Sequence, residues 1–478
     1  MNFPASTGLA RFPILSALPS ISARASLDSL LILWFATTPL ASYFIRFPQD
    51  RSIVTYDRAV FALVALLLLI EWRRQTARRR DGSQVPGVLV ATRFEVAWGV
   101  LALMALTSAL VEANNYTYAT KIAVDAFCLP LLAFHVARHH FDASKRAGSL
   151  ALSSIWLAWF LFSTGAVEFV TGVNLFPYKG SELLREGERR VNGPFASDSS
   201  YAIISLLFVL FVLALPRLFR LRFDTGGHLV YAGALAAGVI ATLLPLFRSV
   251  ALALLVCWAM VEIGLAKHTA SEERERDKEG KDVSSNLLPF LNAASLAKTR
   301  LLVFVVVALG MVVAEGMSGT SRVGSRLADP RNVYGRLATW QAATEVALDR
   351  PFFGVGLTNY GDYYNQKYHW SRQSEESFLE TRAAASPHSN PLWIMAEIGM
   401  VGLVIYLAAN VCLLLMGYRA LKSAADQRQR AAAICYLALL LAYWIPGFGL
   451  TSGAYSDLNL YFFFMLGILS NRSIVSGR

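Results

Sequence analysis

The sequence predicts an all-α, polytopic membrane protein with about twelve transmembrane helices. Hydrophobic residues make up 55% of its 478 residues and charged residues only 16%, and its mean hydropathy is +0.45. The charges gather in short runs between apolar stretches, most of them close to the roughly 20 residues that a helix needs to cross a bilayer. Twelve such stretches follow one another, and the second and the last are short. They lie near residues 28–45, 58–71, 94–111, 118–137, 149–172, 199–215, 228–244, 249–266, 301–316, 391–417, 431–449 and 457–470.

Residues 1–26 lack the compact apolar core of a cleaved signal peptide, so we expect the first span to stay in the mature protein. Orientation follows from the cations, which concentrate in every second connection. This alternation predicts that both termini are cytoplasmic. The cations that define the inner side are Arg73, Arg74, Arg78, Arg79, Arg80, Arg93, Arg138, Lys145, Arg146, Arg217, Arg220, Arg222, Arg419, Lys422, Arg428 and Arg430.

The net charge of +11 does not indicate a nucleic-acid partner. The basic residues border membrane spans, so topology and contact with the lipid bilayer explain them better. Four cysteines lie in apolar spans without metal-like spacing, and we interpret them as packing residues. They are Cys128, Cys257, Cys412 and Cys435.

We predict a single membrane domain over residues 1–478, with two long segments outside the bilayer. Residues 267–300 contain a mixed-charge run typical of a cytoplasmic linker. Residues 317–390 form a large outer loop, in which the apolar spacing from Tyr334 to Leu348 predicts an interfacial amphipathic helix. Aromatic residues after it could stack on sugars or form an interfacial belt. They are Tyr360, Tyr363, Tyr364, Tyr368 and Trp370.

The most informative candidate residue is His388, in the stretch Pro387-His388-Ser389-Asn390-Pro391. Asn390 before Pro391 predicts an N-cap, so His388 is expected beside the positive end of an outer helix, where anions such as phosphates bind. An imidazole there favours chemistry on a lipid-linked phosphate. The structural alternative is a histidine that only caps the helix.

Three arginines are candidates to bind that phosphate. Arg248 lies in a tight outer turn, where an arginine near hydrocarbon is costly unless paired; the alternative is snorkelling to the interface. Arg190 precedes Val191-Asn192-Gly193-Pro194, and the alternative is an ordinary loop cation. Arg336, at the start of the predicted amphipathic helix, is a weaker candidate.

Glu397 is a further weak candidate, two turns into the His388 helix. A carboxylate at that depth needs a partner, for which we expect an arginine or a hydroxyl group, and the alternative is a structural pair. The sequence has no paired-aspartate, His-Glu-x-x-His or phosphate-loop motif. We therefore expect no metal and no cofactor in the reaction, and arginines to neutralise the phosphates.

Together these segments resemble the O-antigen ligase and O-antigen polymerase superfamily, over roughly residues 185–410. The resemblance rests on Arg350-Pro351-Phe352-Phe353-Gly354-Val355-Gly356, on Pro387-His388-Ser389-Asn390-Pro391-Leu392 and on Ala396-Glu397-Ile398-Gly399-Met400-Val401-Gly402-Leu403. Arg248-Ser249 and Asn192-Gly193-Pro194-Phe195 agree with it.

The resemblance implies a GT-C-like membrane glycosyltransferase in the bacterial inner membrane, with a periplasmic active site. It implies a metal-independent, inverting transfer of a glycan from undecaprenyl diphosphate to a glycan or lipid A-core acceptor, by a ligase or a polymerase. Carried over to this chain, Arg190 and Arg248 would bind the diphosphate and His388 would orient or deprotonate the acceptor hydroxyl. The alternatives are a protein O-oligosaccharyltransferase and a non-enzymatic transporter of lipid-linked glycans.

Overall fold

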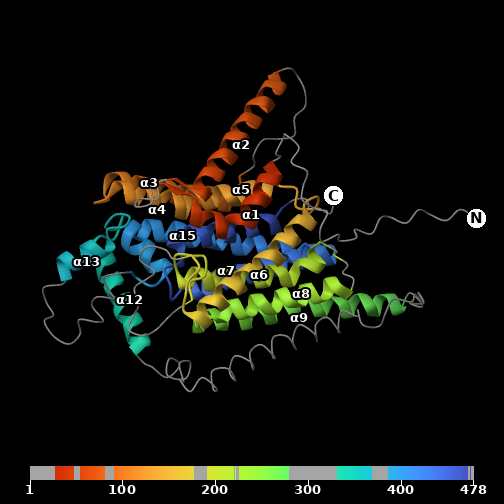
Figure 1. Cartoon of the computed structure of the whole chain (residues 1–478). Coiled ribbons are helices and arrows are strands. Elements are labelled where there is room, and N and C mark those ends of the chain that lie inside the picture. The colour runs from red at the N-terminus through yellow and green to blue at the C-terminus, as the bar shows by residue number, and fades with distance from the viewer. Residues whose placement is uncertain are drawn as a thin grey trace, which may run out of the picture.

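The computed structural model describes residues 27–47, 54–80, 91–176, 191–219, 221, 225–278, 331–368, 386–471 and 474. Nearly all regular structure in these residues is helical, which confirms the all-α class (Figure 1). The strands β1 (Arg46–Phe47) and β2 (Val54–Thr55) form one short antiparallel pair. The helices are α1 (Leu27–Phe44), α2 (Tyr56–Arg80), α3 (Arg93–Val111), α4 (Tyr116–Ala123), the π-helix η1 (Val124–Cys128), α5 (Leu129–His139), α6 (Ala147–Thr171), α7 (Asp198–Leu218), α8 (Thr225–Leu243), α9 (Arg248–Lys278), α12 (Arg331–Asp349), α13 (Tyr360–Tyr368), α15 (Asn390–Lys422), α16 (Gln427–Gly447), the 3₁₀ helix η4 (Ser452–Ala454) and α17 (Ser456–Leu469).

In the described ranges, nine helical stretches are long and apolar enough to cross a membrane, and each coincides with a predicted span. The helices α4, η1 and α5 form one of them, Tyr116–His139. The two spans predicted to be short are the helices α2, whose second half is strongly basic, and α17, which is mostly apolar and only 14 residues long. The predicted span at 301–316 lies outside the described residues.

Helix α7 forms the centre of the bundle. It is apolar around its whole circumference and buried along nearly its full length, because α6, α8, α9, α16 and α17 all pack on it. Outer helices of the bundle, α3, α8 and α15 among them, expose large apolar side chains such as Leu103, Leu229 and Val404. So many exposed apolar residues would be unfavourable in water, and they fit a surface that faces lipid.

Several of the basic connections between helices meet at one end of the bundle. Arg428 donates from Nε to the carbonyl oxygen of Leu218 (2.9 Å) and from Nη2 to Ser144 Oγ (2.6 Å). Asn471 Nδ2 donates to the carbonyl oxygen of Ala137 (2.7 Å). These contacts bring three of the predicted inner connections to the same end, although which side of the membrane this end faces stays a prediction. The basic end, as we call it, comprises residues 27–29, 93–95, 135–148, 217–219, 221, 419–430 and 469–471.

The opposite end carries the longer connections. Asn359 Nδ2 donates to the carbonyl oxygen of Glu112 (2.8 Å), and the amide of Asn114 donates to Asn359 Oδ1 (2.9 Å), so the segment before α13 is fixed to the end of α3. In Figure 1, α12 and α13 lie across this end of the bundle. The loop end, as we call it, comprises residues 111–116, 168–176, 191–197, 244–248, 331–368, 386–400 and 447–455.

Candidate functional site

His388 lies in a strained turn at the start of α15. Its backbone φ is +47°, in the left-handed region that residues other than glycine seldom adopt. Its side chain is half-buried, whereas Pro387 and Ser389 on either side are buried. Because the turn is fixed by buried neighbours, the imidazole has a defined position at the loop end.

The predicted N-cap at Asn390 is wrong by one residue. Ser389 is the N-cap and Asn390 already belongs to α15, with Pro391 next to it. The Asn390 side chain is used elsewhere: Nδ2 donates to Ser452 Oγ (2.9 Å) and Oδ1 accepts from the amide of Gly453 (2.7 Å). These bonds fix the start of α15 to the connection between α16 and α17.

A second contact holds the other side of the same turn. The hydroxyl groups of Ser386 and Thr451 are hydrogen-bonded at 2.6 Å. Behind the turn, Asn390, Trp393 and Tyr406 line a cavity that has room for about one water molecule. A cavity of this size cannot hold a sugar or a diphosphate.

Helix α12 brings Arg336 to this corner. Trp340 Nε1 points to the carbonyl oxygen of His388 (3.5 Å), and Arg336 lies one turn earlier on the same face of α12. The Arg336 guanidinium lies against Gly449, where an added Cβ would stand 2.6 Å from Nη1. Among the predicted site residues, Arg336 and His388 are linked most directly by the described contacts, through Trp340.

The stretch from Tyr334 to Leu348 is helical, as predicted, and forms part of α12, whereas its place at a membrane interface stays a prediction. Ala343 and Val346 pack with Ala396 of α15 and Tyr360 of α13, whereas Leu337 and Leu348 are exposed. Small side chains let α12 approach α15 closely, because they leave room for the neighbouring backbone. The two exposed leucines fit a helix that lies at a membrane interface.

The segment 351–356 is docked onto a break in α15. The helix is interrupted at Gly399, where φ is +82° and ψ is −176°. At the break, the amide of Val355 donates to the carbonyl oxygen of Ala396 (2.9 Å), and the amide of Met400 donates to that of Pro351 (2.8 Å). Polar backbone groups that the break frees inside an apolar helix are thus satisfied by a second segment of chain.

This docking explains the glycines in two of the motifs that carry the resemblance. A Cβ on Gly399 would stand 2.2 Å from the carbonyl oxygen of Phe352, and a Cβ on Gly354 would stand 2.4 Å from the carbonyl carbon of Glu397. Both glycines also have positive φ. The two motifs therefore form one structural unit, which positions the first turns of α15.

Glu397 belongs to the same unit, and the expected arginine or hydroxyl partner is wrong. The buried carboxylate accepts from Trp393 Nε1 (2.7 Å) and from the backbone amides of Thr358 and Tyr360. Its donors come from one turn earlier in α15 and from the start of α13. Glu397 therefore has a structural role in fixing the 358–360 segment against α15.

Arg190 lies outside the described residues, but the segment directly after it is well fixed. The amides of Asn192 (3.0 Å) and Gly193 (2.7 Å) both donate to Glu168 Oε2 at the end of α6. Gly193 has a φ of +54° and lies against the ring of Tyr201, where a Cβ would stand 2.4 Å from a ring carbon. Residues 191–193, which directly follow Arg190 in the chain, are therefore fixed at the loop end.

Arg248 is the first residue of α9, and its side chain is exposed. The preceding turn includes Leu246 at a φ of +60°. No hydrogen bond or ion pair between the described residues connects Arg248 with His388, so the structure brings these two residues to the same end of the bundle without joining them.

The aromatic residues of α13 do not form one exposed surface. Tyr360 is buried and its ring stacks on that of Tyr364, with centroids 6.2 Å apart. Burial raises the pKa of the Tyr360 phenol, which keeps it protonated. Tyr360 is therefore a packing residue, and Trp370 lies outside the described residues.

The described contacts also identify residues that the sequence analysis did not select: Trp340, Ser386 and Thr451. Trp340 could have been selected from the sequence, because it is four residues after Arg336 and so lies on the same helix face. Ser386 and Thr451 had none, because they are far apart in the sequence and meet only in the folded chain.

A comparison with known families decides which family this region represents. The O-antigen ligase family matches residues 191–407, a range that includes Arg248, Arg336, His388 and Glu397. This region is therefore similar to the O-antigen ligase family. This confirms the resemblance to the O-antigen ligase and polymerase superfamily, and it supports a membrane enzyme that transfers glycans. Arg190 directly precedes the matched range, and no curated protein matches the chain.

Proposed function

We propose that this member of the O-antigen ligase family transfers a glycan from undecaprenyl diphosphate to an acceptor hydroxyl at the loop end of the bundle. The observation that carries the proposal is the fixed, strained turn at His388, which lies inside the matched range and next to the Arg336 face of α12. Strained residues that their surroundings hold in position are typical of functional sites.

The donor supplies a leaving group whose negative charge grows as the glycosidic bond breaks. Guanidinium groups stabilise such charge, because they present several N–H donors in a fixed plane. In the proposed mechanism, Arg190 and Arg248 bind the diphosphate and Arg336 contributes beside His388. The amides at the start of α15 add a second source of positive potential for an anion.

The acceptor hydroxyl is a poor nucleophile until a base removes its proton. A neutral imidazole is a suitable base near pH 7, and we assign this role to His388. The hydroxyl oxygen attacks the anomeric carbon as the bond to the diphosphate oxygen breaks, and the proton passes to the imidazole. Attack opposite the leaving group inverts the anomeric centre.

The location follows from the lipid donor. An undecaprenyl chain stays in the bilayer, so the diphosphate meets the protein at the membrane surface, where the loop end lies. We propose that this surface is the periplasmic face of the inner membrane, because the cations of the basic end are typical of the cytoplasmic side. The acceptor is a lipid A core for a ligase, or a growing glycan for a polymerase.

The test is transfer by the purified full-length protein in detergent. With an undecaprenyl-diphosphate glycan and an acceptor, we expect a new glycosidic product by mass spectrometry, with equal yield after addition of a chelator. Absence of product with both a lipid A-core acceptor and a glycan acceptor would contradict the proposal. In a deletion strain, accumulation of lipid-linked polymer identifies a ligase, and attachment of single repeats identifies a polymerase.

A further inference from the structure

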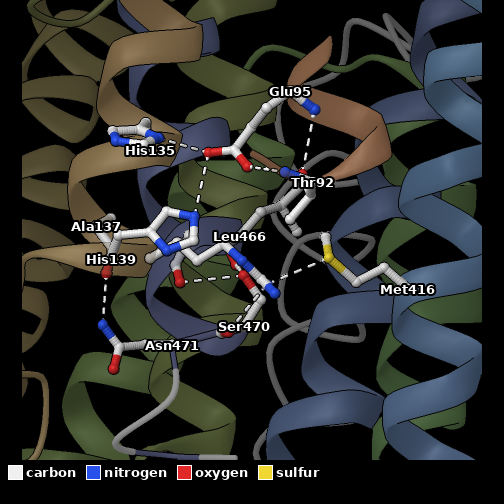
Figure 2. A network of polar contacts seen from close by, with 11 residues as sticks. Thr92, Glu95, His135, Ala137, His139, Met416, Leu466, Ser470 and Asn471 are labelled. Carbon is white, nitrogen blue, oxygen red and sulfur yellow. Dashed lines mark hydrogen bonds and ion pairs between the residues drawn. The ribbon is translucent and has the colours of Figure 1, made fainter. Parts of the chain in front are cut away.

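Three side chains with metal-binding atoms meet at the basic end, far from the His388 turn. They are Glu95 in the first turn of α3 and His135 and His139 in the last turns of α5 (Figure 2). One ligand atom from each lies within 4.8 Å of the other two. Glu95 is separated from the loop end of α3 by nearly the whole helix, a distance of roughly 25 Å.

Both imidazoles point to the same carboxylate oxygen. His135 Nδ1 lies 2.7 Å from Glu95 Oε1, and His139 Nε2 lies 3.3 Å from the same atom. The two histidines are four residues apart on α5, so they share one face of the helix. Figure 2 shows the carboxylate between the two rings.

The carboxylate is held in position before any ligand binds. The backbone amide of Thr92 donates to Glu95 Oε2, and the amide of Glu95 donates to Thr92 Oγ1 (3.2 Å), which together form a capping box. Because Oε2 is occupied by this bond, Oε1 is the oxygen directed to the histidines. Partners of this kind orient ligands around many metal ions.

An ion pair alone does not account for His139. Its Nε2 is buried and makes no hydrogen bond of good geometry within the described part of the chain. Arg138, which precedes His139 in the chain, has its own partners, because Nη1 donates to the carbonyl oxygen of Ser470 (3.0 Å) and contacts Met416 Sδ. Glu95 therefore faces two imidazoles, one of which lacks a suitable hydrogen-bond partner.

We propose that Glu95, His135 and His139 bind one divalent transition-metal ion of the zinc type. Two imidazole nitrogens and one carboxylate oxygen are a common ligand set for zinc, with a water molecule in the fourth position. Around a tetrahedral zinc ion, ligand atoms lie about 3.3 Å apart, as follows from metal–ligand distances of about 2.0–2.1 Å. The separation of Glu95 Oε1 and His139 Nε2 already has this value, and small side-chain rotations complete the set.

The ion would join the start of α3 to the end of α5. The side chain of His135 is 21% exposed and that of Glu95 only 5%, so an ion can reach the site from the aqueous side of the basic end. The site is distant from the proposed transfer site, so the metal has a stabilising role and takes no part in glycan transfer. Hard cations such as Mg²⁺ prefer oxygen ligands and should not compete.

The experiment uses the full-length protein in detergent, purified through a tag without histidine, stripped with a chelator and then equilibrated with Zn²⁺. For the wild type we expect about one zinc per chain by mass spectrometry of the metal, and a higher melting temperature with Zn²⁺ but not with Mg²⁺. In Glu95→Gln and His139→Gln we expect a loss of affinity of at least about 100-fold. His228→Gln, which changes a histidine of α8, is the matched control and should keep the metal.

A second measurement needs no variant of the site. Co²⁺ added to the stripped wild type should give the visible absorption of a four-coordinate ion, and Zn²⁺ should remove it. The proposal is overturned if the wild type binds less than about a tenth of an equivalent of Zn²⁺ and gives no such absorption with Co²⁺. Metal retained in both Glu95→Gln and His139→Gln would also overturn it.

Discussion

The two ends of the bundle are built from different kinds of interaction. In the described part of the chain, every residue with positive φ lies at the loop end or in the break of α15 beside it. These residues are Gly172, Gly193, Leu246, Gly354, Gly356, Thr358, His388 and Gly399. At the basic end, ordinary helix termini are joined by side chains that donate to main-chain carbonyl groups, as Arg428 and Asn471 do.

This difference distinguishes the basic end, which stabilises the fold, from the loop end, where we propose the reactive site. A strained backbone costs about 1–3 kcal/mol per residue and persists only where the surroundings over-determine it. The basic end achieves its packing without such strain. The comparison therefore predicts that substitutions at the loop end change activity, whereas matched substitutions at the basic end change at most stability.

The largest effect is expected from replacement of His388. In His388→Asn, we expect the transfer rate to fall by about 100-fold to 10,000-fold, because the base is lost. The melting temperature should stay close to that of the wild type, because asparagine tolerates the left-handed conformation. Initial rates of product formation and thermal unfolding measure the two effects. Full activity in this variant would rule out the proposed base.

The arginines come next. In Arg336→Ala and in Arg248→Ala we expect the rate to fall by roughly 100-fold, because each removes a cation that stabilises the leaving group. The control is Arg419→Ala in the last turn of α15 at the basic end, for which we expect a rate near that of the wild type. If the loss in the control equals that in Arg336→Ala, a general effect of charge explains the result better than phosphate binding.

The break in α15 should be sensitive to a single methyl group. In Gly399→Ala the added Cβ meets the carbonyl oxygen of Phe352 in a conformation that alanine disfavours, so we expect a loss of about 3 kcal/mol. The transfer rate should fall with it, because segment 351–356 positions the start of α15. The melting temperature and the rate are measured on the same preparation.

The matched control is Gly148→Ala at the basic end, where an added Cβ meets nothing within 4 Å. It should be neutral or stabilise α6 by at most about 1 kcal/mol. Equal losses in the two glycine variants would show that the break at Gly399 has no special role.

The smallest effect is expected from Trp393→Phe, which takes one donor from the buried Glu397 carboxylate. We expect a loss of about 1–3 kcal/mol, because a buried acceptor is left short of a hydrogen-bond donor. In the control Trp156→Phe, the indole that is lost is largely exposed and donates to the carbonyl oxygen of Ala36 (3.2 Å). We expect a change within about 0.5 kcal/mol there. Unchanged melting temperatures in both variants would contradict the role of Glu397.

The helices could be predicted from the sequence because the bilayer imposes a simple rule on length and hydropathy. The start of a helix directly after His388 was also predictable to within one residue, because Pro391 marks a first turn. The use of Asn390 was not, because its amide bonds to Ser452 and Gly453, which are about 60 residues away in the chain and become neighbours only when α16 and α17 pack.

The remaining errors have the same physical origin. An arginine or a hydroxyl group was expected for Glu397 from the cost of a buried carboxylate, whereas backbone amides and an indole supply the donors. The cluster of Glu95, His135 and His139 needs the pairing of α3 with α5, which hydropathy does not encode. The sequence nevertheless contained one indication of this cluster, because His135 and His139 are four residues apart on an amphipathic stretch.

The interruption at Gly399 has a mechanical consequence. A continuous helix of 33 residues would transmit each tilt of its C-terminal end directly to His388 near its N-terminus. In this chain the helix is interrupted, and segment 351–356 bonds to both sides of the break, to Ala396 and Glu397 before it and to Met400 and Val401 after it. The orientation of the first turns of α15, and with it that of the His388 turn, therefore depends on segment 351–356 as well as on the long part of the helix.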